Sequence, residues 1–238
     1  MVCDLDTPKN LIYAAIFECS SPRIAEQLHS RLPICAVAEQ IGEDASAYLR
    51  KDPAMRGDSW SLYNACSSFR AVLHYRLARA IDDVANESAE QDLDLRSVST
   101  LISSRGKLLS GAEIHVGARI GRRFVLDHGY GTVIGETAEI GDDCYVLGGV
   151  TIGAVGISEN SAGKRHPTIG CRVEIGAFAR ILGTVRIGDD VFIGSHCVIT
   201  NDVLSGSRVV VKTALQVTRL WDTGTTRTAL PLEPIKHQ

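Results

Sequence analysis

A six-residue repeat constrains the fold of this chain more than any other feature. Between about residues 114 and 205, an aliphatic residue, usually followed by glycine, returns every six residues in thirteen hexads. A period of six fits neither an amphipathic helix nor an alternating strand, and it is typical of parallel β-helices, in which three hexads form one triangular coil. We therefore predict a stacked column with the aliphatic side chains inside. Their positions are Ile114, Ile120, Leu126, Ile134, Ile140, Val146, Ile152, Ile169, Ile175, Ile181, Ile187, Ile193 and Ile199.

The repeat loses its spacing at two places. The interval grows from six to eight after Leu126, where Asp127 and His128 lie. It grows to seventeen after Ile152, and residues 153–168 lack the pattern. We interpret this second segment as a loop that leaves the column, and loops on a rigid scaffold often carry function. The alternative, an insertion without function, stays open at this point.

Composition narrows the class of protein. The chain has 238 residues, 45% of them hydrophobic, which suits one large domain or two modest ones. With a formal net charge of -3 it offers no basic field for nucleic acid or an anionic membrane, so small molecules are the expected partners. No apolar run is long enough to span a bilayer and the chain begins without a signal-like segment, so we expect a cytoplasmic protein. The seven cysteines form no CxxC pair, which argues against a disulfide framework or a thiolate zinc site.

The first 110 residues lack hexads and are rich in Ala, Leu, Arg and Glu, which predicts helices. Ser21 followed by Pro22 is typical of a helix start, and a second helix is predicted over residues 34–49, closing on the basic residues Arg50 and Lys51. Apolar residues at helical spacing predict one long helix over 59–81, and the acidic segment 82–97 is expected to be an exposed connector. The predicted fold class is α+β, with a helical domain at 1–110, a β-helix at 111–205, and a strand and flexible tail at 206–238.

Histidine is the side chain best suited to move a proton near neutral pH, so each histidine is a candidate. His128 and His166 lie at the two breaks of the repeat, and each has a charged neighbour, Asp127 or Arg165. We therefore predict that these two carry the chemistry, as general bases or as metal ligands. A catalytic zinc site normally uses three protein ligands, and the short His-x-x-x-x-His pair of hexapeptide carbonic anhydrases is missing from this sequence. The sequence thus favours a site without metal.

Several motifs together resemble those of one enzyme family. They are EIHVGARIGRRFVLDHGYGTVIGETAEIG, VTIGAVG and GKRHPTIG in the repeat, and KDPA ahead of the segment FRAVLHYRLARAI. Over about residues 51–202 the chain resembles the serine O-acetyltransferases, which carry an Asp-His motif and an Arg-His-Pro motif in the same register. The resemblance implies a left-handed parallel β-helix that trimerises, with each active site between two columns. It also implies acetyl transfer from acetyl-CoA to the hydroxyl of L-serine, a step of cysteine biosynthesis.

The resemblance also implies roles for individual residues. Serine needs a base to take its hydroxyl proton, carboxylates to hold its ammonium group and a cation to hold its carboxylate. The matching residues are His128 as the general base, Glu113 as its orienting carboxylate in place of the family's Asp, Asp52 and Asp127 for the ammonium group, and Arg165 and His166 for the carboxylate, with His166 also counted as catalytic. Coenzyme A is expected in the groove between columns, near Gly148, Gly149, Gly153 and Lys164.

Some features depart from the family pattern. The loop GAVGISENSAGKRHP is longer and less rich in glycine, and VKTALQV replaces the usual segment after the last coil. The helical region is shorter, so a homotrimer is expected, with the family's dimer of trimers as the alternative. The chain ends Lys236-His237-Gln238 instead of with the isoleucine that the family docks into O-acetylserine sulfhydrylase, so no such complex is expected by that route.

Three alternative functions stay open. The altered loop is compatible with acylation of homoserine or another small amino compound of a specialised pathway. A zinc carbonic anhydrase of the hexapeptide type predicts a bound metal, and a non-catalytic scaffold predicts no turnover of a thioester. The scaffold leaves Asp127, His128 and His166 unexplained at the two irregular places of the repeat.

Overall fold

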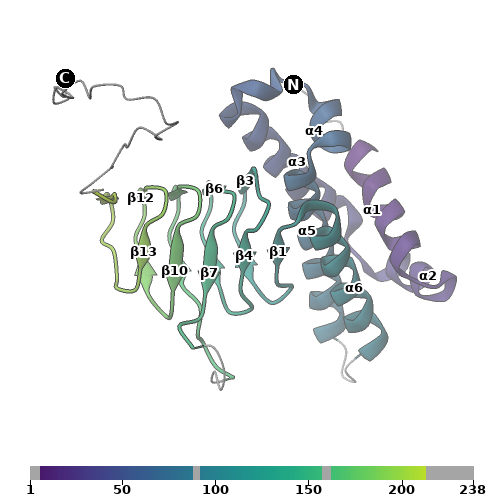
Figure 1. Ribbon diagram of the computed structural model, residues 1–238. Coiled ribbons are helices and arrows are strands. Elements are labelled where there is room, and N and C mark those ends of the chain that lie inside the picture. The colour runs from purple at the N-terminus through teal and green to yellow at the C-terminus, as the bar shows by residue number, and fades with distance from the viewer. Residues whose placement is uncertain (1–5, 88–91, 157–161, 213–238) are drawn as a thin grey trace, which may run out of the picture.

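The computed structural model describes residues 6–87, 92–156 and 162–212. A group of helices packs against one end of a column of short parallel strands (Figure 1). The helices are α1 (Asp6–Cys19), α2 (Pro22–Arg31), α3 (Ile34–Lys51), the short 3₁₀ helix η1 (Pro53–Met55), α4 (Ser59–Ala65), α5 (Ser67–Asn86) and α6 (Leu93–Ser110). None of the helices in these residues is long and apolar enough to cross a bilayer.

Local capping explains where several helices begin. Ser21 caps α2, because its hydroxyl accepts the Ile24 N–H, and Pro22 fills the first turn. The single helix expected over 59–81 is wrong: Cys66 has extended backbone (φ -77°, ψ 103°), ends α4 and precedes α5. The exposed connector expected over 82–97 is also wrong, because α5 continues to Asn86 and α6 begins at Leu93, where the preceding Asp92 accepts the Leu95 N–H.

The strands form three parallel sheets, which are the three faces of the column. Sheet A contains β1 (Glu113–Ile114), β4 (Val133–Ile134), β7 (Thr151–Gly153), β10 (Arg180–Leu182) and β13 (Val198–Ile199). Sheet B contains β2 (Arg119–Ile120), β5 (Glu139–Ile140), β8 (Thr168–Ile169) and β11 (Arg186–Ile187). Sheet C contains β3 (Val125–Asp127), β6 (Tyr145–Leu147), β9 (Glu174–Ile175), β12 (Phe192–Ile193) and β14 (Arg208–Val209).

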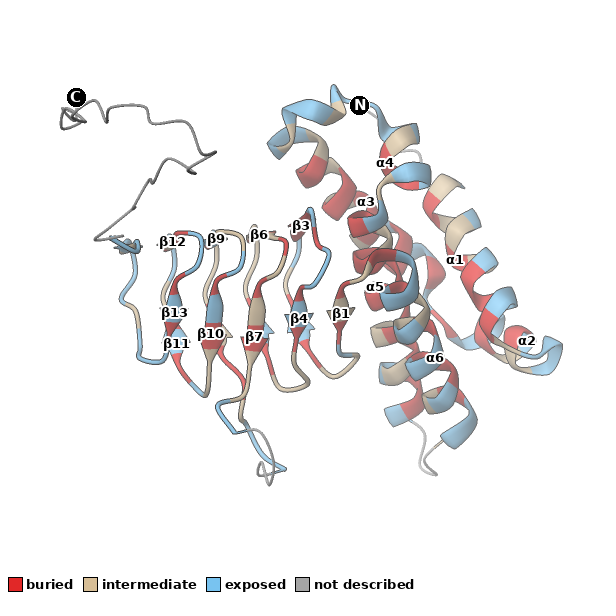
Figure 2. Cartoon of the chain, in the orientation of Figure 1, coloured by how far each residue is buried: buried red, intermediate tan, exposed pale blue. Residues whose placement is uncertain are grey.

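The hexad residues stack inside the column as the repeat predicts. In sheet A, Ile134 pairs with Ile114 on one side and Ile152 on the other, and Ile152 pairs in turn with Ile181. All thirteen hexad positions are buried, and the core of the column is visible as the buried residues of each coil in Figure 2. The column also continues past Ile199, the last hexad of the sequence pattern. Val203 bridges to Ile187, and β14 pairs with β12.

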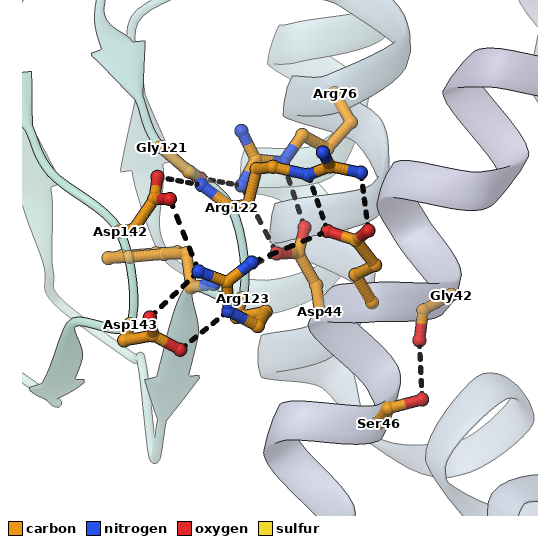
Figure 3. A network of polar contacts seen from close by, with 11 residues as sticks. Gly42, Asp44, Ser46, Arg76, Gly121, Arg122, Arg123, Asp142 and Asp143 are labelled. Atoms are coloured by element: carbon orange, nitrogen blue, oxygen red, sulfur yellow. Dashed lines mark hydrogen bonds and ion pairs between the residues drawn. The ribbon is translucent and has the colours of Figure 1, made fainter.

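The helices cover the open end of the column. The first coil has no preceding coil to pair with, so its backbone groups need other partners. Tyr75 donates its hydroxyl to Ala118 O (2.7 Å), and Arg76 donates to the carbonyl oxygens of Ile120 (2.6 Å) and Gly121 (2.5 Å). Arg76 is itself held by Asp44 in a buried ion pair of 2.8 Å (Figure 3). These bonds fix the helices relative to the first coil.

Candidate active site

His128 lies at the corner where sheet C passes into sheet A. Its backbone is in the left-handed region (φ 50°), which places its carbonyl oxygen directly above Gly148. A Cβ at position 148 would come within 1.8 Å of that oxygen, so the corner requires glycine there. The imidazole is 86% exposed, and its Nε2 lies 3.8 Å from Oδ1 of Asp127. The corner therefore presents a free imidazole to a ligand, beside a carboxylate.

Asp127 is buried beneath this imidazole. Its Oδ1 accepts the Tyr48 hydroxyl at 2.9 Å, and its Oδ2 accepts the Tyr145 hydroxyl at 2.6 Å. Asp52 follows α3, caps η1 by accepting the Ala54 N–H at 2.8 Å, and acts electrostatically on Tyr145. The structure thus brings His128, Asp127 and Asp52, three predicted site residues, to one corner.

His166 lies at the corner where sheet A passes into sheet B, between β7 and β8. Its Nδ1 accepts the Thr137 N–H at 3.1 Å and lies 2.8 Å from Thr137 Oγ1. The remaining proton of a neutral ring is therefore on Nε2, which makes this atom a hydrogen-bond donor. Burial lowers the pKa of His166, and the neighbouring Arg165 lowers it further. This neutral donor is suited to hold an anionic oxygen.

Two cations flank His166. Arg165 forms an ion pair with Glu136, and the Arg165 hydrogen bond lowers the pKa of the Glu136 carboxyl. Lys164 donates to Thr137 O at 2.7 Å and lies 3.3 Å from Glu139. A cavity of about 330 Å³ adjoins Lys164, Glu136 and Thr137. This second corner therefore carries two cations, each paired with a glutamate, whereas the corner with His128 is acidic.

The structure does not bring the two corners together within one chain. His128 lies before β4 of sheet A, and His166 lies after β7 of the same sheet. The two residues are therefore at opposite ends of the sheet A strands. The larger cavity, of about 610 Å³, lies between α5 and sheet B and contains none of the predicted site residues. Within one chain the predicted site residues therefore form two separate groups.

The remaining predicted residues have structural contacts of their own. Glu113 forms an ion pair with Lys107, and its strand β1 pairs with β4, which follows the His128 corner. Gly149 has a left-handed backbone (φ 70°), and its N–H donates to Tyr130 O at 3.0 Å. The carbonyl of Gly153 accepts the Gly183 N–H at 2.9 Å.

Reasoning from the sequence missed four residues of the two corners, namely Glu136, Thr137, Tyr48 and Tyr145. Glu136 and Thr137 lie in the GETA segment, so the motif itself contained their signal. Tyr48 and Tyr145 had no such signal, because a tyrosine on an apolar helix face, or ahead of a hexad aliphatic, is indistinguishable from a packing residue.

Comparisons with known proteins identify the family and the fold of the chain. Residues 166–201 match the family model of the bacterial transferase hexapeptide (six repeats). Serine acetyltransferase of Helicobacter pylori (strain ATCC 700392 / 26695) is 40% identical over 171 residues, which cover 72% of this chain and 92% of that protein. The Staphylococcus xylosus serine acetyltransferase is 48% identical over 174 residues, 72% of this chain and 74% of that protein. A crystal structure of the Neisseria gonorrhoeae serine acetyltransferase in complex with serine superposes with a TM-score of 0.71 at 29% identity, covering 89% of this chain and 84% of that one.

The column of hexapeptide repeats and the similarity to these relatives define a hexapeptide-repeat acyltransferase. The chain belongs to the serine acetyltransferase family, a family of enzymes. The fold class expected from the sequence, helices followed by a left-handed parallel β-helix, is confirmed. The prediction about the terminal residues and a sulfhydrylase partner lies outside the described residues.

Proposed function

We propose that this protein transfers an acetyl group from acetyl-CoA to the hydroxyl of L-serine and produces O-acetyl-L-serine and coenzyme A. The observation that carries the proposal is the pair of corners: an exposed imidazole above buried Asp127 at one edge of sheet A, and His166 with Arg165 at the other. The acidic corner suits the ammonium group of an amino acid, and the hydrogen-bond donors of His166 and Arg165 suit its carboxylate.

In this proposal His128 is the general base. It takes the serine hydroxyl proton as the oxygen attacks the thioester carbon, and it returns that proton to the sulfur of coenzyme A when the carbon–sulfur bond breaks. Glu113 is assigned to orient the imidazole, because its position matches the orienting carboxylate in the motif of the family. Asp52 and Asp127 are assigned to the ammonium group.

The His166 corner is assigned to the serine carboxylate and to coenzyme A. His166, which donates through Nε2, holds the serine carboxylate together with Arg165. His166 is therefore assigned both a binding and a catalytic role. Coenzyme A is placed along the groove beside sheet A. Its contacts are assigned to the turn with Gly148 and Gly149, and to the loop from Gly153 to Lys164.

The separation of the corners supports a homotrimer in which each site lies between two columns. Sheet A and its edges also carry a group of exposed hydrophobic side chains, which a neighbouring column would cover. They are Tyr130, Val133, Val155, Phe178 and Val198. A dimer of trimers that is built through the helices is the alternative assembly. Because acetyl-CoA is an intracellular metabolite, the proposed location is the cytoplasm, and the proposed pathway is cysteine biosynthesis.

The proposal is tested by release of free thiol from acetyl-CoA, with L-serine, L-homoserine, L-threonine or no acceptor in parallel. We expect turnover with L-serine, and in His128→Ala a loss of about 10²- to 10⁴-fold, the usual contribution of a general base. Circular dichroism and size-exclusion chromatography check that the variant is folded. Near-normal turnover in a folded His128→Ala would remove the assigned base, and turnover with another acceptor alone would overturn the assignment of serine.

A further inference from the structure

The buried carboxylate of Asp127 is held at both of its oxygens by tyrosines. Tyr48 donates its hydroxyl to Oδ1 at 2.9 Å, and Tyr145 donates to Oδ2 at 2.6 Å. Because each phenol donates to a different oxygen, the pair fixes the rotation of the carboxylate about the Cβ–Cγ bond of Asp127. We call Tyr48 and Tyr145 the tyrosine clamp.

The two phenols come from different parts of the chain. Tyr48 lies in α3, is 3% exposed and is 79 residues from Asp127 in sequence. Tyr145 begins β6, the strand that pairs with β3, so it reaches Asp127 from within sheet C. The acidic corner is therefore completed only when α3 is packed against the column.

The contacts of Tyr48 also direct its proton. The thiol of Cys66 lies 3.5 Å from the Tyr48 hydroxyl and donates to it, so the phenol proton is left for Asp127. Burial raises the pKa of Tyr48, and the hydrogen bond with Cys66 raises it further. Burial also raises the pKa of Tyr145, and its hydrogen bond with Asp127 adds to this effect. Both phenols consequently remain protonated donors at physiological pH.

The clamp leaves Asp127 able to bind further donors. An ionised carboxylate has about four lone-pair positions, and the two phenols use one on each oxygen. His128 Nε2 faces Oδ1 at 3.8 Å, so this oxygen lies beside the imidazole that is assigned as the base. A cationic group bound to a rigidly held Asp127 would be fixed next to that base.

We propose that Tyr48 and Tyr145 are positioning residues for the acceptor, which hold Asp127 in the orientation that binds the acceptor's ammonium group beside His128. This inference deepens the proposed function and rests on it. It assigns a role in acceptor recognition to a helix residue and a strand residue that never touch the reacting atoms.

The test compares Tyr48→Phe and Tyr145→Phe with the unchanged protein in steady-state kinetics. Each variant keeps the ring and removes one hydrogen bond to a charged group, so we expect the KM for L-serine to rise at least about tenfold. The KM for acetyl-CoA should stay within about twofold, because the thioester does not depend on Asp127 for binding. A KM for serine that does not change, or an equal rise in both KM values, would overturn the proposal.

Tyr75→Phe is the matched control. Tyr75 is also a buried tyrosine between helices and column, but its hydroxyl bonds to Ala118 O (2.7 Å) and the Ile120 N–H (3.2 Å). We expect it to lower the thermal unfolding midpoint without the selective rise in the KM for serine. If Tyr75→Phe raises that KM as much as the clamp variants do, general loosening of the interface explains the effect and the positioning role is excluded.

A thermal double-mutant cycle separates failure of the clamp from failure of the proposed function. The drop in Tm caused by Tyr145→Phe should shrink by about half or more when Asp127 is already alanine, because interacting residues are non-additive. The drop caused by Tyr75→Phe should be the same in both backgrounds. Additive effects for Tyr145 overturn the clamp whatever the activity. Absence of turnover with every amino-acid acceptor overturns the proposed function, and the acceptor role of the clamp with it.

Discussion

Two buried histidines illustrate how single side chains are set by their surroundings. His166 accepts the Thr137 N–H through Nδ1, whereas His74 in α5 donates Nδ1–H to Arg70 O at 2.7 Å, because a carbonyl can only accept. Burial is the main cause that lowers the pKa of both. The folded protein therefore favours two neutral rings with opposite tautomers.

These lowered pKa values make stability depend on pH. In the unfolded chain both rings take up protons near the ordinary histidine value of 6.5, but in the folded protein they do so only at lower pH. The unfolded state then binds more protons, so the contribution is fully present above 6.5 and is lost as pH falls below it. We expect a lower urea midpoint at about pH 5.5 than at about pH 7.5. His74→Gln should reduce this difference, and an unchanged difference in His74→Gln would contradict the assignment.

At the scale of elements, the first coil depends on the helices that cover it. Strands β1, β2 and β3 each pair with a following strand on one side only, and the other side meets side chains of the helices. Ser103 donates to Ile114 O at 2.9 Å, and Ser68 accepts the Gly129 N–H at 2.8 Å. The same elements that satisfy the open edge therefore also support the turn that follows His128.

The buried ion pair between Asp44 and Arg76 is the central part of this cover. Asp44 also accepts the Phe124 N–H at 2.9 Å, and both side chains are almost fully buried. Asp44→Asn leaves the Arg76 charge buried without its counter-charge, so we expect the free energy of unfolding to fall by about 3–5 kcal/mol. Urea denaturation measures the change. Arg172→Ala, which removes an exposed pair with Asp190, is the control and should change stability little; equal losses in both variants would contradict this ranking.

At the scale of the whole molecule, the separation of the two corners determines how a complete site can form. His128 and His166 lie at opposite ends of the sheet A strands in one chain, so a single chain does not bring the two groups of predicted site residues together. In a closed ring of identical columns, the edge of one chain lies next to the opposite edge of its neighbour. This arrangement supports the proposed site between copies.

Mixed oligomers test the shared site. His128→Ala and His166→Ala are each expected to be nearly inactive as pure proteins. When the two are dissociated and reassembled in equal amounts, half of the chains carry an intact His128 and half of their neighbours an intact His166, so about one quarter of the sites should be complete. The thiol-release assay should then recover about that fraction of normal activity. No recovery in a mixture shown by mass spectrometry to contain both chains would place both histidines of a site in one copy.

The sequence determined the column, its two irregular corners and several helix ends. A hexad core position must be aliphatic in every coil, so the periodic pattern alone located Ile114 to Ile199 on the inside. The breaks at Asp127-His128 and before His166 were visible for the same reason, since an interrupted period marks a departure from the coil. The long helix over 59–81 was predicted wrongly because the break at Cys66 preserves helical spacing on both sides.

Only the tertiary structure decided which side chains meet around these corners. Tyr48 reaches Asp127 from 79 residues away, and Arg76 reaches Asp44 and the first coil across two elements. Such contacts depend on how α3 and α5 dock on the end of the column, and a single hydrogen bond between distant residues leaves no periodic trace in a sequence. Repetition is a local property and can be read along the chain, whereas the partners of a buried polar group are fixed only when the elements pack.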